Sequence, residues 1–337
     1  MKILVVRFKQ IGDSVLASPI CGSLKKTYPD GEIDYVVYEH IAPLFENHLS
    51  IDKVISITRE EQKNPFKYLR KVWKVTRKKY DIVIDIMSTP KSEVFTLLSP
   101  TAKYRIGRRK SKRGYTYTHK IDEPRDAKDK VDKFLKMLKP LENSGVDVKY
   151  DHDYSIHLTD EEKKKLRYRM QQAGINFNKP VFAFAINSRR PNKIWKRDYM
   201  VEVINHCIDK YKAQAVFYYS PTEKTYAKET HEMMEWNKNI FSNVETKSIR
   251  ELAMLLANCD MFVGNEGGPR HIAQGLDVPS LAIFSPSAEK KEWLSNANDR
   301  HQGIETKDIG AKEYFDIKPS HVIEKLDDMI DRYVEKR

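Results

Sequence analysis

A loop with two adjacent glycines, in the second half of the chain, has residue types suited to binding a phosphate. It carries Glu266, Gly267 and Gly268 between an apolar run at 260–264 and a predicted short helix that includes His271. Glycines let a ligand approach the backbone, and a helix start directs free N–H groups and positive dipole charge toward an anion. The segment therefore predicts a nucleotide site. His271 either supports this loop or contacts the ligand directly, and the sequence does not distinguish the two roles.

A second polar segment follows the apolar run at 180–187. It contains Ser188, two arginines and Lys193, and it continues into Trp195. Hydroxyl, guanidinium and ammonium groups at the carboxyl end of a strand suit a diphosphate, which needs donors and positive charge. Ser188 and Lys193 are the candidates for holding it. Trp195 is expected to pack beneath this loop rather than to stack on a base.

Asp13 lies at the turn between the first predicted strand, 2–8, and the first predicted helix. Its carboxylate could cap that helix by accepting a backbone N–H group. Alternatively, it lies in the crevice at the carboxyl end of a doubly wound sheet and acts as a general base on a hydroxyl. The residue types alone leave both interpretations open.

Short β-rich apolar runs alternate with longer helical patterns along the whole chain, which indicates an α/β fold with parallel sheets. The polar stretch 142–155 predicts a hinge. We therefore expect domains at 1–155 and 156–318, followed by a helix at 319–337 that packs on them. Strands are predicted at 2–8, 32–38, 53–57, 81–86, 103–107, 180–187, 213–219, 260–264 and 280–284. Helices are predicted at 13–28, 41–47, 64–79, 91–99, 126–142, 159–173, 198–210, 222–235, 248–257 and 319–334.

Composition places the chain among ordinary soluble globular proteins. With 337 residues, 40% of them hydrophobic, it can form two domains, and no apolar run approaches the ~20 residues that cross a bilayer. The apolar N-terminus is too short for a signal peptide, so a cytoplasmic location is expected. The cysteines Cys21, Cys207 and Cys259 are far apart in apolar surroundings, which predicts buried thiols.

The net charge of +12 implies an acidic partner, such as a nucleotide, a nucleic acid, or an anionic membrane and its glycolipids. The run 103–113 lacks acidic residues and includes Arg105, Arg108, Arg109 and Lys112. It is either a solvated loop or a site for a phosphorylated acceptor or for the inner-membrane surface. A nucleic-acid partner is not expected, because the run has one aromatic residue and follows no nucleic-acid motif.

Several familiar motifs are absent or incomplete. A single glycine follows the first strand, which argues against a nicotinamide oxidoreductase, and neither a P-loop nor a hydrolase elbow occurs. The stretch at 231–235 has a histidine but lacks the second one of a zinc helix, so it predicts a surface helix. The pair Asp151 and Asp153 has metal-binding spacing but lies in the polar hinge, where solvated carboxylates are expected.

Taken together, these segments resemble glycosyltransferase family 9, the heptosyltransferases that build the inner core of lipopolysaccharide. The likeness extends over nearly the whole chain. It rests on residues 3–7, 11–16, 23–29, 193–195, 262–273 and 284–287.

The resemblance implies a GT-B fold, two Rossmann-like domains that face a central cleft. It implies inverting transfer of heptose from ADP-heptose to the lipopolysaccharide core, with no cofactor and no obligatory metal ion. Asp13 matches the family's catalytic base, and Lys193 matches the lysine that holds the donor diphosphate. Glu266 to His271 match the nucleotide loop, and Glu223 loosely matches an acidic residue near the nucleoside.

Three departures from the family pattern affect the expected donor. The family usually has Asp and then Ser or Thr where this chain has Glu266 and Gly267. It usually has a glycine pair in place of Tyr218 and Tyr219, and Gly-Pro-Thr in place of residues 285–287. A longer carboxylate and a lost hydroxyl would reshape the nucleoside pocket. Another nucleotide sugar, such as a UDP-hexose, is therefore the alternative donor, for use in surface-polysaccharide synthesis.

Overall fold

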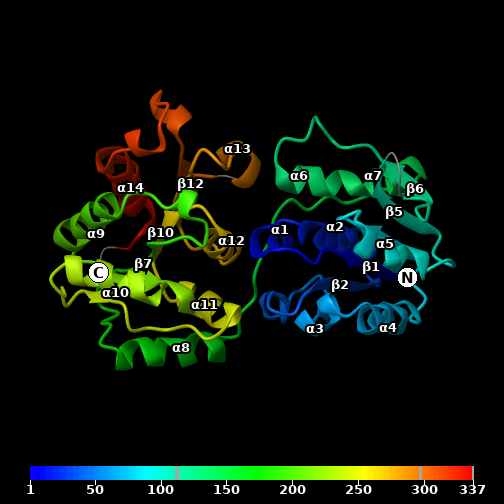
Figure 1. The fold of residues 1–337 in the computed structure, drawn as a ribbon, viewed down its shortest axis with the longest axis horizontal. Helices are drawn as coiled ribbons and strands as arrows, with labels where there is room; N and C mark the ends of the chain where they lie inside the picture. The colour runs from blue at the N-terminus through cyan, green and yellow to red at the C-terminus, as the bar shows by residue number, and fades with distance from the viewer. Residues whose placement is uncertain (111–113, 296–297, 336–337) are drawn as a thin grey trace. The chain divides into compact units, whose positions relative to one another are not determined.

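The computed structural model describes residues 1–110, 114–295 and 298–335. The chain divides into two compact units, Met1–His157 and Leu158–Arg337. Among the residues described, each unit contains one six-stranded sheet, and helices cover the sheets (Figure 1). All strand pairs in both sheets are parallel, which fits the alternation of strands and helices in the sequence. The fold is therefore α/β with two Rossmann-like units.

The sheet of the first unit has the strand order β3-β2-β1-β4-β5-β6. Val6, at the end of β1, pairs in register with Val36 of β2 on one side and Asp85 of β4 on the other. Central strands are buried on both faces, as parallel sheets require. The strands are β1 (Lys2–Val6), β2 (Glu32–Tyr38), β3 (Lys53–Ile57), β4 (Ile82–Asp85), β5 (Tyr104–Arg108) and β6 (His119–Ile121).

Two of the long helices predicted for this unit are interrupted by prolines. The predicted helix 13–28 is divided into α1 and α2, because Pro19 has no N–H group to continue the hydrogen-bond ladder. The predicted helix 126–142 is divided into α6, η2 and α7, with Pro140 in the first turn of α7. The helices are α1 (Ile11–Val15), α2 (Pro19–Thr27), η1 (Ala42–Phe45), α3 (Arg59–Lys63), α4 (Pro65–Thr76), α5 (Pro90–Leu97), α6 (Lys130–Leu135), η2 (Lys136–Leu138) and α7 (Lys139–Asn143).

The sheet of the second unit has the strand order β12-β11-β10-β7-β8-β9. The short strands β9 and β12, like β6 in the first unit, were not predicted. All three lie at sheet edges, where a few residues pair with only one neighbour and need no long apolar run. The strands are β7 (Val181–Ala185), β8 (Gln214–Tyr218), β9 (Ile240–Phe241), β10 (Met261–Asn265), β11 (Ser280–Ile283) and β12 (His301–Ile304).

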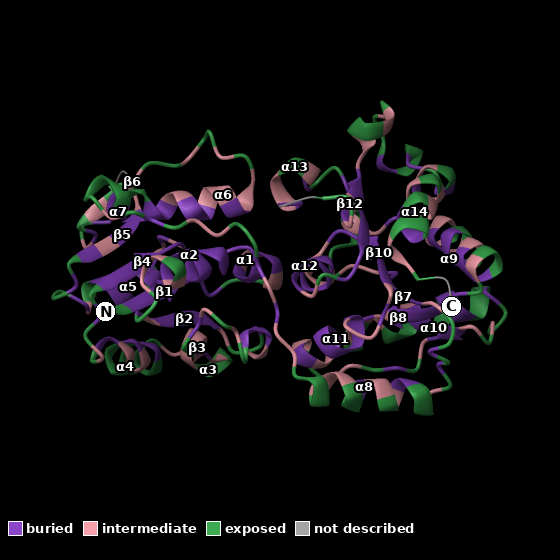
Figure 2. Cartoon of the chain, turned by 180° about the vertical axis from the view of Figure 1, so that it is seen from behind, coloured by how far each residue is buried: buried purple, intermediate pink, exposed green. Residues whose placement is uncertain are grey.

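The last helix of the chain, α14, belongs to the core of the second unit. Its residues Val322, Leu326, Met329 and Ile330 are buried in one core cluster with side chains of α9. Figure 2 shows α14 beside α9. The remaining helices are α8 (Asp160–Gln172), η3 (Pro191–Lys193), α9 (Arg197–Tyr211), η4 (Pro221–Glu223), α10 (Lys224–Met233), α11 (Ile249–Leu256), α12 (Gly268–Gly275), α13 (Lys290–Trp293), η5 (Thr306–Ile309) and η6 (Tyr314–Asp316), with α14 at Pro319–Tyr333.

The polar segment before the second unit is attached to α2. The N–H of Asp151 donates to Ser23 Oγ at 2.8 Å, and the N–H of Lys149 donates to Thr27 Oγ1 at 2.9 Å. The Asp151 carboxylate also pairs with Lys26 at 3.0 Å. The expectation of a solvated carboxylate is therefore wrong for Asp151, because hydroxyl groups of α2 bind the segment.

Two other expectations concern buried polar groups. Cys21, Cys207 and Cys259 are free and buried, as predicted, and burial raises the pKa of each thiol. His231 was placed on a surface helix, but it lies on the buried side of α10, where Nδ1 contacts Ser242 Oγ at 2.9 Å. The helix is amphipathic, and the surface interpretation is wrong for this residue.

Across the part of the chain that the structure describes, we find no helix both long and apolar enough to cross a membrane.

Candidate active site

The strand order creates one topological switch point in each sheet. In the second unit, β7 leads to β8 and β9 on one side, whereas β10 leads to β11 and β12 on the other. In the first unit, β1 and β4 are the corresponding neighbours. Loops that leave adjacent strands in opposite directions open a crevice at the carboxyl edge, where open α/β sheets bind ligands. The predicted site residues follow these strands.

An ion pair joins the two predicted loops of the second unit. Lys193 lies in η3 after β7, and Glu266 directly follows β10. The Lys193 ammonium donates a hydrogen bond to the Glu266 carboxylate, and the two side chains are 13% and 5% exposed. The pair brings together residues that were predicted separately for the diphosphate and for the nucleotide loop.

Asn265 and Trp195 hold this ion pair in place. The Asn265 amide oxygen accepts the backbone N–H of Trp195 at 2.9 Å, and its amide nitrogen donates to Ala185 O at 3.3 Å. Trp195 is fully buried, and its indole N–H donates to Ile317 O at 2.9 Å. The expectation that Trp195 packs beneath the lysine loop is confirmed. A single asparagine thus connects the ends of β7 and β10.

The glycines of the loop differ in the space that surrounds their Cα atoms. A Cβ at Gly264 would lie 2.6 Å from both the carbonyl oxygen and the Cβ of Ala185, so only glycine lets β10 pair this closely with β7. Gly267 has an extended backbone with φ 169°, which any residue adopts, and a Cβ there would meet only Pro269 at 3.7 Å. Gly267 therefore leaves open space at the start of α12. Gly268 is the first residue of that helix, where N–H groups have no helical acceptor.

His271 lies beneath the loop rather than on its surface. It is 1% exposed, and its ring nitrogens face the guanidinium of buried Arg270, with Nδ1 at 2.7 Å. Burial, followed by the charges of Arg270 and Lys193, lowers its pKa well below the ordinary value. Arg270 also donates to Gln274 Oε1 at 2.6 Å and to Trp293 O at 2.7 Å. This burial favours the supporting role for His271 over direct contact with a ligand.

Ser188 and Glu223 lie at the carboxyl ends of β7 and β8, but they differ in their contacts. Ser188 is partly exposed, and its hydroxyl accepts only a long bond, 3.4 Å, from the N–H of Arg190. The Glu223 carboxylate accepts the N–H of Ser220 at 2.7 Å and completes a capping box. The hydrogen bond of Glu223 is thus confined to its own turn, whereas the Ser188 hydroxyl remains available to a ligand.

A pocket of about 190 Å³ opens next to η4, between the end of β8 and the start of α11. Tyr218 and Tyr219 line it on one side, and Thr246 to Ile249 line the other. Burial, together with the charge of Glu223, raises the pKa of Tyr218 to about 12, so this phenol stays protonated. The hydroxyl of Tyr219 donates to Ser242 O. The two tyrosines that replace the family's glycine pair therefore form one wall of this pocket.

In the first unit, Asp13 forms an ion pair with Arg7. Arg7 follows β1, and its Nη2 donates to Asp13 Oδ1 at 2.6 Å. Of the two interpretations of Asp13, capping is wrong, because Asp13 is the third residue of α1 and Gln10 is the residue before the helix. The Asp13 side chain is 13% exposed, so it is not fully enclosed by protein. Asp13 thus lies at the switch point between β1 and β4 with a fixed orientation.

Arg7 is itself held by burial. Its guanidinium lies 4.6 Å from the centre of the Phe134 ring, and its side chain is 7% exposed. Burial lowers the pKa of Arg7, whereas Asp13 raises it, so the cation depends on this carboxylate as its partner. Lys9 lies farther from Asp13, at 3.8 Å, and is 53% exposed.

Asp85, at the end of β4, is a fully buried carboxyl at this switch point, and no sequence pattern pointed to it. Its Oδ1 accepts the N–H groups of Met87 and Ser88, and its Oδ2 accepts the Tyr117 hydroxyl at 2.7 Å. Burial raises its pKa to about 6, while these hydrogen bonds lower it. Ser88 has φ 50°, a left-handed conformation that the contacts to Asp85 stabilise. Asp85 therefore shapes the loop beside Asp13.

Within the described part of the basic run, residues 103–110, the arginine side chains bind different partners. Arg105 donates to the backbone carbonyls of Thr116 and Pro100, each at 2.7 Å, and Arg108 pairs with Glu123 at 3.2 Å. Three positions apart on β5, the two residues point to opposite faces of the sheet. Arg109 is 61% exposed and pairs with Asp122 at 2.8 Å. Lys112 lies outside the described residues.

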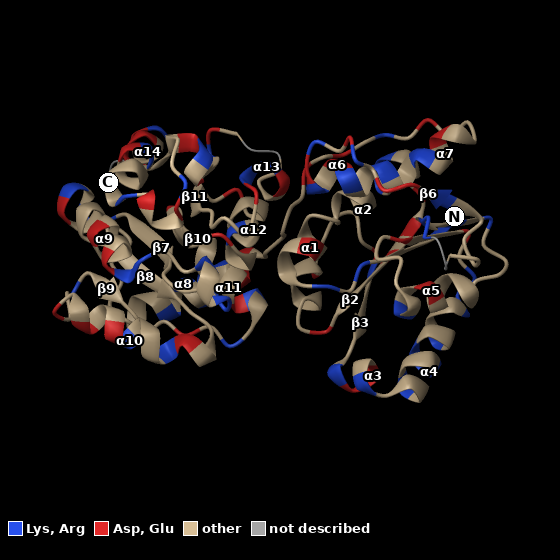
Figure 3. Ribbon diagram, turned by 45° about the horizontal axis from the view of Figure 1, so that its top comes forward, with Lys and Arg blue, Asp and Glu red and all other residues tan. Residues whose placement is uncertain are grey.

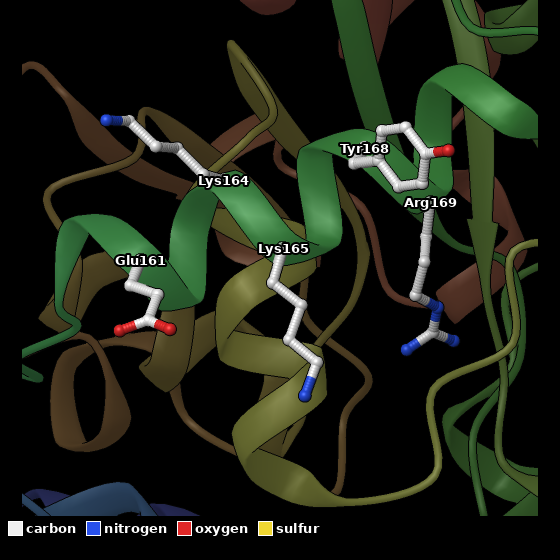
Figure 4. Close-up of a pocket in the computed structure, with 5 residues that line it drawn as sticks. All are labelled: Glu161, Lys164, Lys165, Tyr168 and Arg169. Carbon is white, nitrogen blue, oxygen red and sulfur yellow. The ribbon is translucent and has the colours of Figure 1, made fainter.

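A larger surface hollow, of 690 Å³, lies on α8, the helix that precedes the strands of the second sheet (Figure 4). Glu161, Lys164, Lys165, Tyr168 and Arg169 line it, and Figure 4 shows these side chains diverging from one helix. A ligand site needs polar groups that converge, so this hollow is not a candidate. Within the described residues, no three His, Cys, Asp or Glu side chains form a cluster that could hold a metal ion.

Arg7 and Asn265 are the functional candidates that sequence reasoning missed. In the sequence, Arg7 is one residue of the N-terminal segment and Asn265 is one residue of the glycine loop, and no motif distinguishes either. The one available signal was their position, directly after β1 and at the end of β10. Their roles follow from partners six and 70 residues away.

The two Rossmann-like units, with candidate residues after the central strands of both sheets, define the GT-B class of glycosyltransferases. Residues 69–316 match glycosyltransferase family 9 (heptosyltransferase), and the chain belongs to this family. It is therefore a glycosyltransferase enzyme.

Individual relatives agree with this assignment. Lipopolysaccharide heptosyltransferase 1 of Campylobacter coli is 23% identical over 307 residues, which cover 88% of each chain. A family 9 glycosyl transferase from Veillonella parvula has a similar crystal structure, with a TM-score of 0.85, 21% identity, and coverage of 98% of this chain and 97% of that one. The E. coli ADP-heptose lps heptosyltransferase II has a TM-score of 0.77 at 20% identity, covering 98% and 99%. The structural likenesses establish the fold.

Proposed function

We propose that this enzyme transfers heptose from ADP-heptose to the inner core of lipopolysaccharide. The observation that carries the proposal is the Lys193–Glu266 ion pair at the switch point of the second sheet, beside the open start of α12. Family membership and the names of the relatives from C. coli and E. coli support the sugar and the acceptor. The second unit would bind the nucleotide sugar, and the first would bind the acceptor.

Lys193 would hold the diphosphate of the donor. Its ammonium is directed by Glu266, and the N–H groups of Gly267 and Gly268 and the hydroxyl of Ser188 supply further donors. These groups stabilise the negative charge that develops as the bond between the anomeric carbon and the phosphate oxygen breaks. They do electrostatically what a metal ion does in other transferases, so the proposed reaction requires no cofactor.

Asp13 would act as the general base. It accepts the proton of the acceptor hydroxyl as that oxygen bonds to the anomeric carbon, and ADP leaves from the opposite side with the bonding electrons. Attack opposite the leaving group inverts the anomeric configuration. Arg7 would orient the carboxylate for this proton transfer.

The decisive experiment compares the wild type with Asp13→Asn on a purified core acceptor and ADP-heptose. We expect the variant to lose nearly all transfer while it still binds ADP, because the amide keeps the shape of the side chain but accepts no proton. Transfer at the wild-type rate would contradict the base assignment. Mass spectrometry of lipopolysaccharide from a strain that lacks this gene identifies the missing sugar.

A second donor is favoured by one specific observation. Tyr218 and Tyr219 line the pocket at the end of β8, and Glu266 with Gly267 replaces the family's usual pair. These changes would reshape the nucleoside pocket, so a UDP-hexose used in surface-polysaccharide synthesis is the alternative donor. Thermal-shift titration with ADP and UDP separates the two, because the nucleotide that binds more tightly stabilises the fold at lower concentration. We expect ADP to bind more tightly.

The acceptor is a glycolipid, so we propose that the enzyme works at the cytoplasmic face of the inner membrane. The net charge of +12 supports contact with this anionic surface. Arg108 and Arg109 are candidates for acceptor phosphates, although each already pairs with a carboxylate. Arg105 is a weaker candidate, because its guanidinium is bound to backbone carbonyls.

A further inference from the structure

Helix α4 of the first unit presents apolar side chains to solvent on one continuous stripe. Phe66, Leu69 and Trp73 are 84%, 46% and 53% exposed, and their spacing of three and four residues places them on one helix face. The buried face of the same helix is formed by Tyr68, Val72 and Thr76. The exposed stripe is therefore additional to the face that packs on the sheet, and folding of the unit does not explain it.

A basic stripe runs beside these apolar residues. Arg70 and Lys74 are exposed and form no ion pair with any described residue, and Arg77 stacks on Trp73 at 4.9 Å. Lys67 and Lys71 pair with Glu60 and Glu61, the acidic residues of α3. Helix α4 itself has no acidic residue. Figure 3 shows the Lys and Arg bands along α3 and α4.

The combination is that of a helix that lies in a lipid interface. Aromatic and aliphatic side chains enter the boundary between headgroups and acyl chains, while flanking cations reach the lipid phosphates. We propose that α4 is a membrane-contact helix, which inserts Phe66, Leu69 and Trp73 into an anionic bilayer surface. Arg70, Lys74 and Arg77 then contact the phosphates of the headgroups.

Other partners fit this surface less well. A second copy of the chain would bring two basic stripes together, and like charges oppose such a contact. Single-stranded nucleic acids bind positively charged grooves, whereas an exposed helix face is convex. The charge of α4 is complementary to acidic lipids, and its stripe is apolar enough to enter them.

Topology connects this helix to the acceptor side of the unit. The chain leaves β3 at the carboxyl edge of the sheet and returns through α3 and α4 to begin β4 at the opposite edge. Phe66, near the start of α4, therefore lies toward the edge at which Arg7 and Asp13 follow β1. Contact through α4 would keep that edge near lipid-anchored molecules. The inference is independent of the proposed sugar transfer, because lipid binding is measured without substrates.

The experiment is sedimentation of the full-length protein with vesicles of equal parts phosphatidylglycerol and phosphatidylethanolamine, and with vesicles of phosphatidylcholine alone. We expect binding to the anionic vesicles that weakens with salt. The double variant Phe66→Ser with Trp73→Ser should bind about tenfold more weakly, since two of the inserted side chains are lost. The variant Arg70→Gln with Lys74→Gln should lose most of the preference for anionic vesicles.

A matched control is Tyr168→Ser on α8, where one aromatic residue, 62% exposed, is surrounded by lysines without an apolar stripe. It should bind as the wild type does. Because the altered α4 side chains are exposed, all variants should keep the wild-type circular dichroism and melting temperature. They should also keep wild-type activity on a detergent-dispersed acceptor, so failure of lipid binding is distinguishable from failure of the proposed activity.

Three results would overturn the proposal. The first is wild-type protein that does not sediment with anionic vesicles. The second is an α4 double variant that binds as tightly as the wild type. The third is a wild-type protein that forms a nucleic-acid complex in gel shifts, or a dimer in light scattering, that the double variant no longer forms. That result would assign the stripe to the nucleic acid or to a second copy of the chain. Trp73→Phe adds a direct readout of insertion. This variant should still bind the vesicles, but the blue shift of tryptophan fluorescence that vesicles cause should be smaller than in the wild type, because Trp73 is absent.

Discussion

Glu266 and Lys193 form a largely buried ion pair although 73 residues separate them in the chain. β7 and β10 are adjacent and parallel, so the loops that follow them meet at one edge of the sheet. The pair fixes the ammonium against Glu266, the residue that precedes Gly267 and Gly268 in the loop. A buried cation with a single direct counter-charge is sensitive to any change of that partner.

Glu266→Gln should therefore lower stability and increase the response to nucleotide. Removing the carboxylate leaves the ammonium without its counter-charge, at a cost of about 3 kcal/mol. A bound diphosphate restores negative charge, so the rise in melting temperature with ADP should be larger in the variant than in the wild type. Glu229→Gln, which removes the carboxylate of an exposed ion pair with Arg197, is the control. An equal response in Glu266→Gln and the wild type would show that the diphosphate does not bind at Lys193.

Lys193→Ala should reduce turnover by about two to three orders of magnitude, which is typical for removal of one preorganised charge-stabilising group. The measurement is steady-state transfer with saturating acceptor. Lys196→Ala is the matched control, because Lys196 is exposed on the same segment. It should retain nearly full activity. Unchanged turnover in Lys193→Ala would remove this residue from the site.

Arg7→Lys should lower kcat about tenfold to a hundredfold with little change in KM. Lysine keeps the charge but cannot reproduce the geometry with which the guanidinium holds Asp13, and a small misplacement of a catalytic group is costly. Lys9→Ala tests the alternative that any nearby cation suffices, and it should have wild-type kinetics because the Lys9 side chain is mostly exposed. Equal losses in both variants would contradict a specific role for Arg7.

Two glycine variants should have opposite phenotypes. Gly264→Ala forces β10 away from Ala185, which should destabilise the second unit by about 1–3 kcal/mol in chemical denaturation. Gly267→Ala meets no backbone atom and should leave stability unchanged, while it weakens ADP binding in calorimetry by occupying the open space beside α12. Wild-type ADP affinity in Gly267→Ala would show that the phosphate does not approach the backbone there.

Stability should fall as the pH is lowered from about 7.5 to about 5.5. Burial, with His157 nearby, lowers the pKa of His48 to about 4. Burial also lowers the pKa of His301 to about 4 and that of His271 well below its ordinary value. The unfolded chain then binds protons that the folded state does not, which costs about 1 kcal/mol per histidine at the acid end. Asp85 opposes this, because its raised pKa makes the folded state bind a proton more readily below about pH 6.

His48→Asn tests the contribution of one histidine. Asparagine can still accept the N–H of Ser50, which donates to His48 Nδ1 at 3.1 Å, but it does not titrate. Melting temperatures of the variant should therefore decline less steeply over the same pH range. A decline as steep as that of the wild type would contradict the assignment.

The sequence by itself determined the fold class, the regular elements and the loops that carry the candidate residues. Apolar runs at 180–187 and 260–264 predicted buried strands, and the polar residues that follow them had to lie at carboxyl ends. The pattern also predicted that Trp195 is buried and that the three thiols are free. These features follow from local periodicity and composition, which report whether a segment is buried.

The tertiary structure decided which residues are partners. The pairing of Lys193 with Glu266 depends on β7 lying beside β10, and the orientation of Asp13 depends on where burial places the Arg7 guanidinium. The attachment of Asp151 to α2 and the exposed stripe on α4 likewise follow from packing, whereas the prolines that divide two predicted helices are a local signal. Strand order and burial bring distant segments together, and a local pattern contains no information about either, because it extends over only a few residues of the chain.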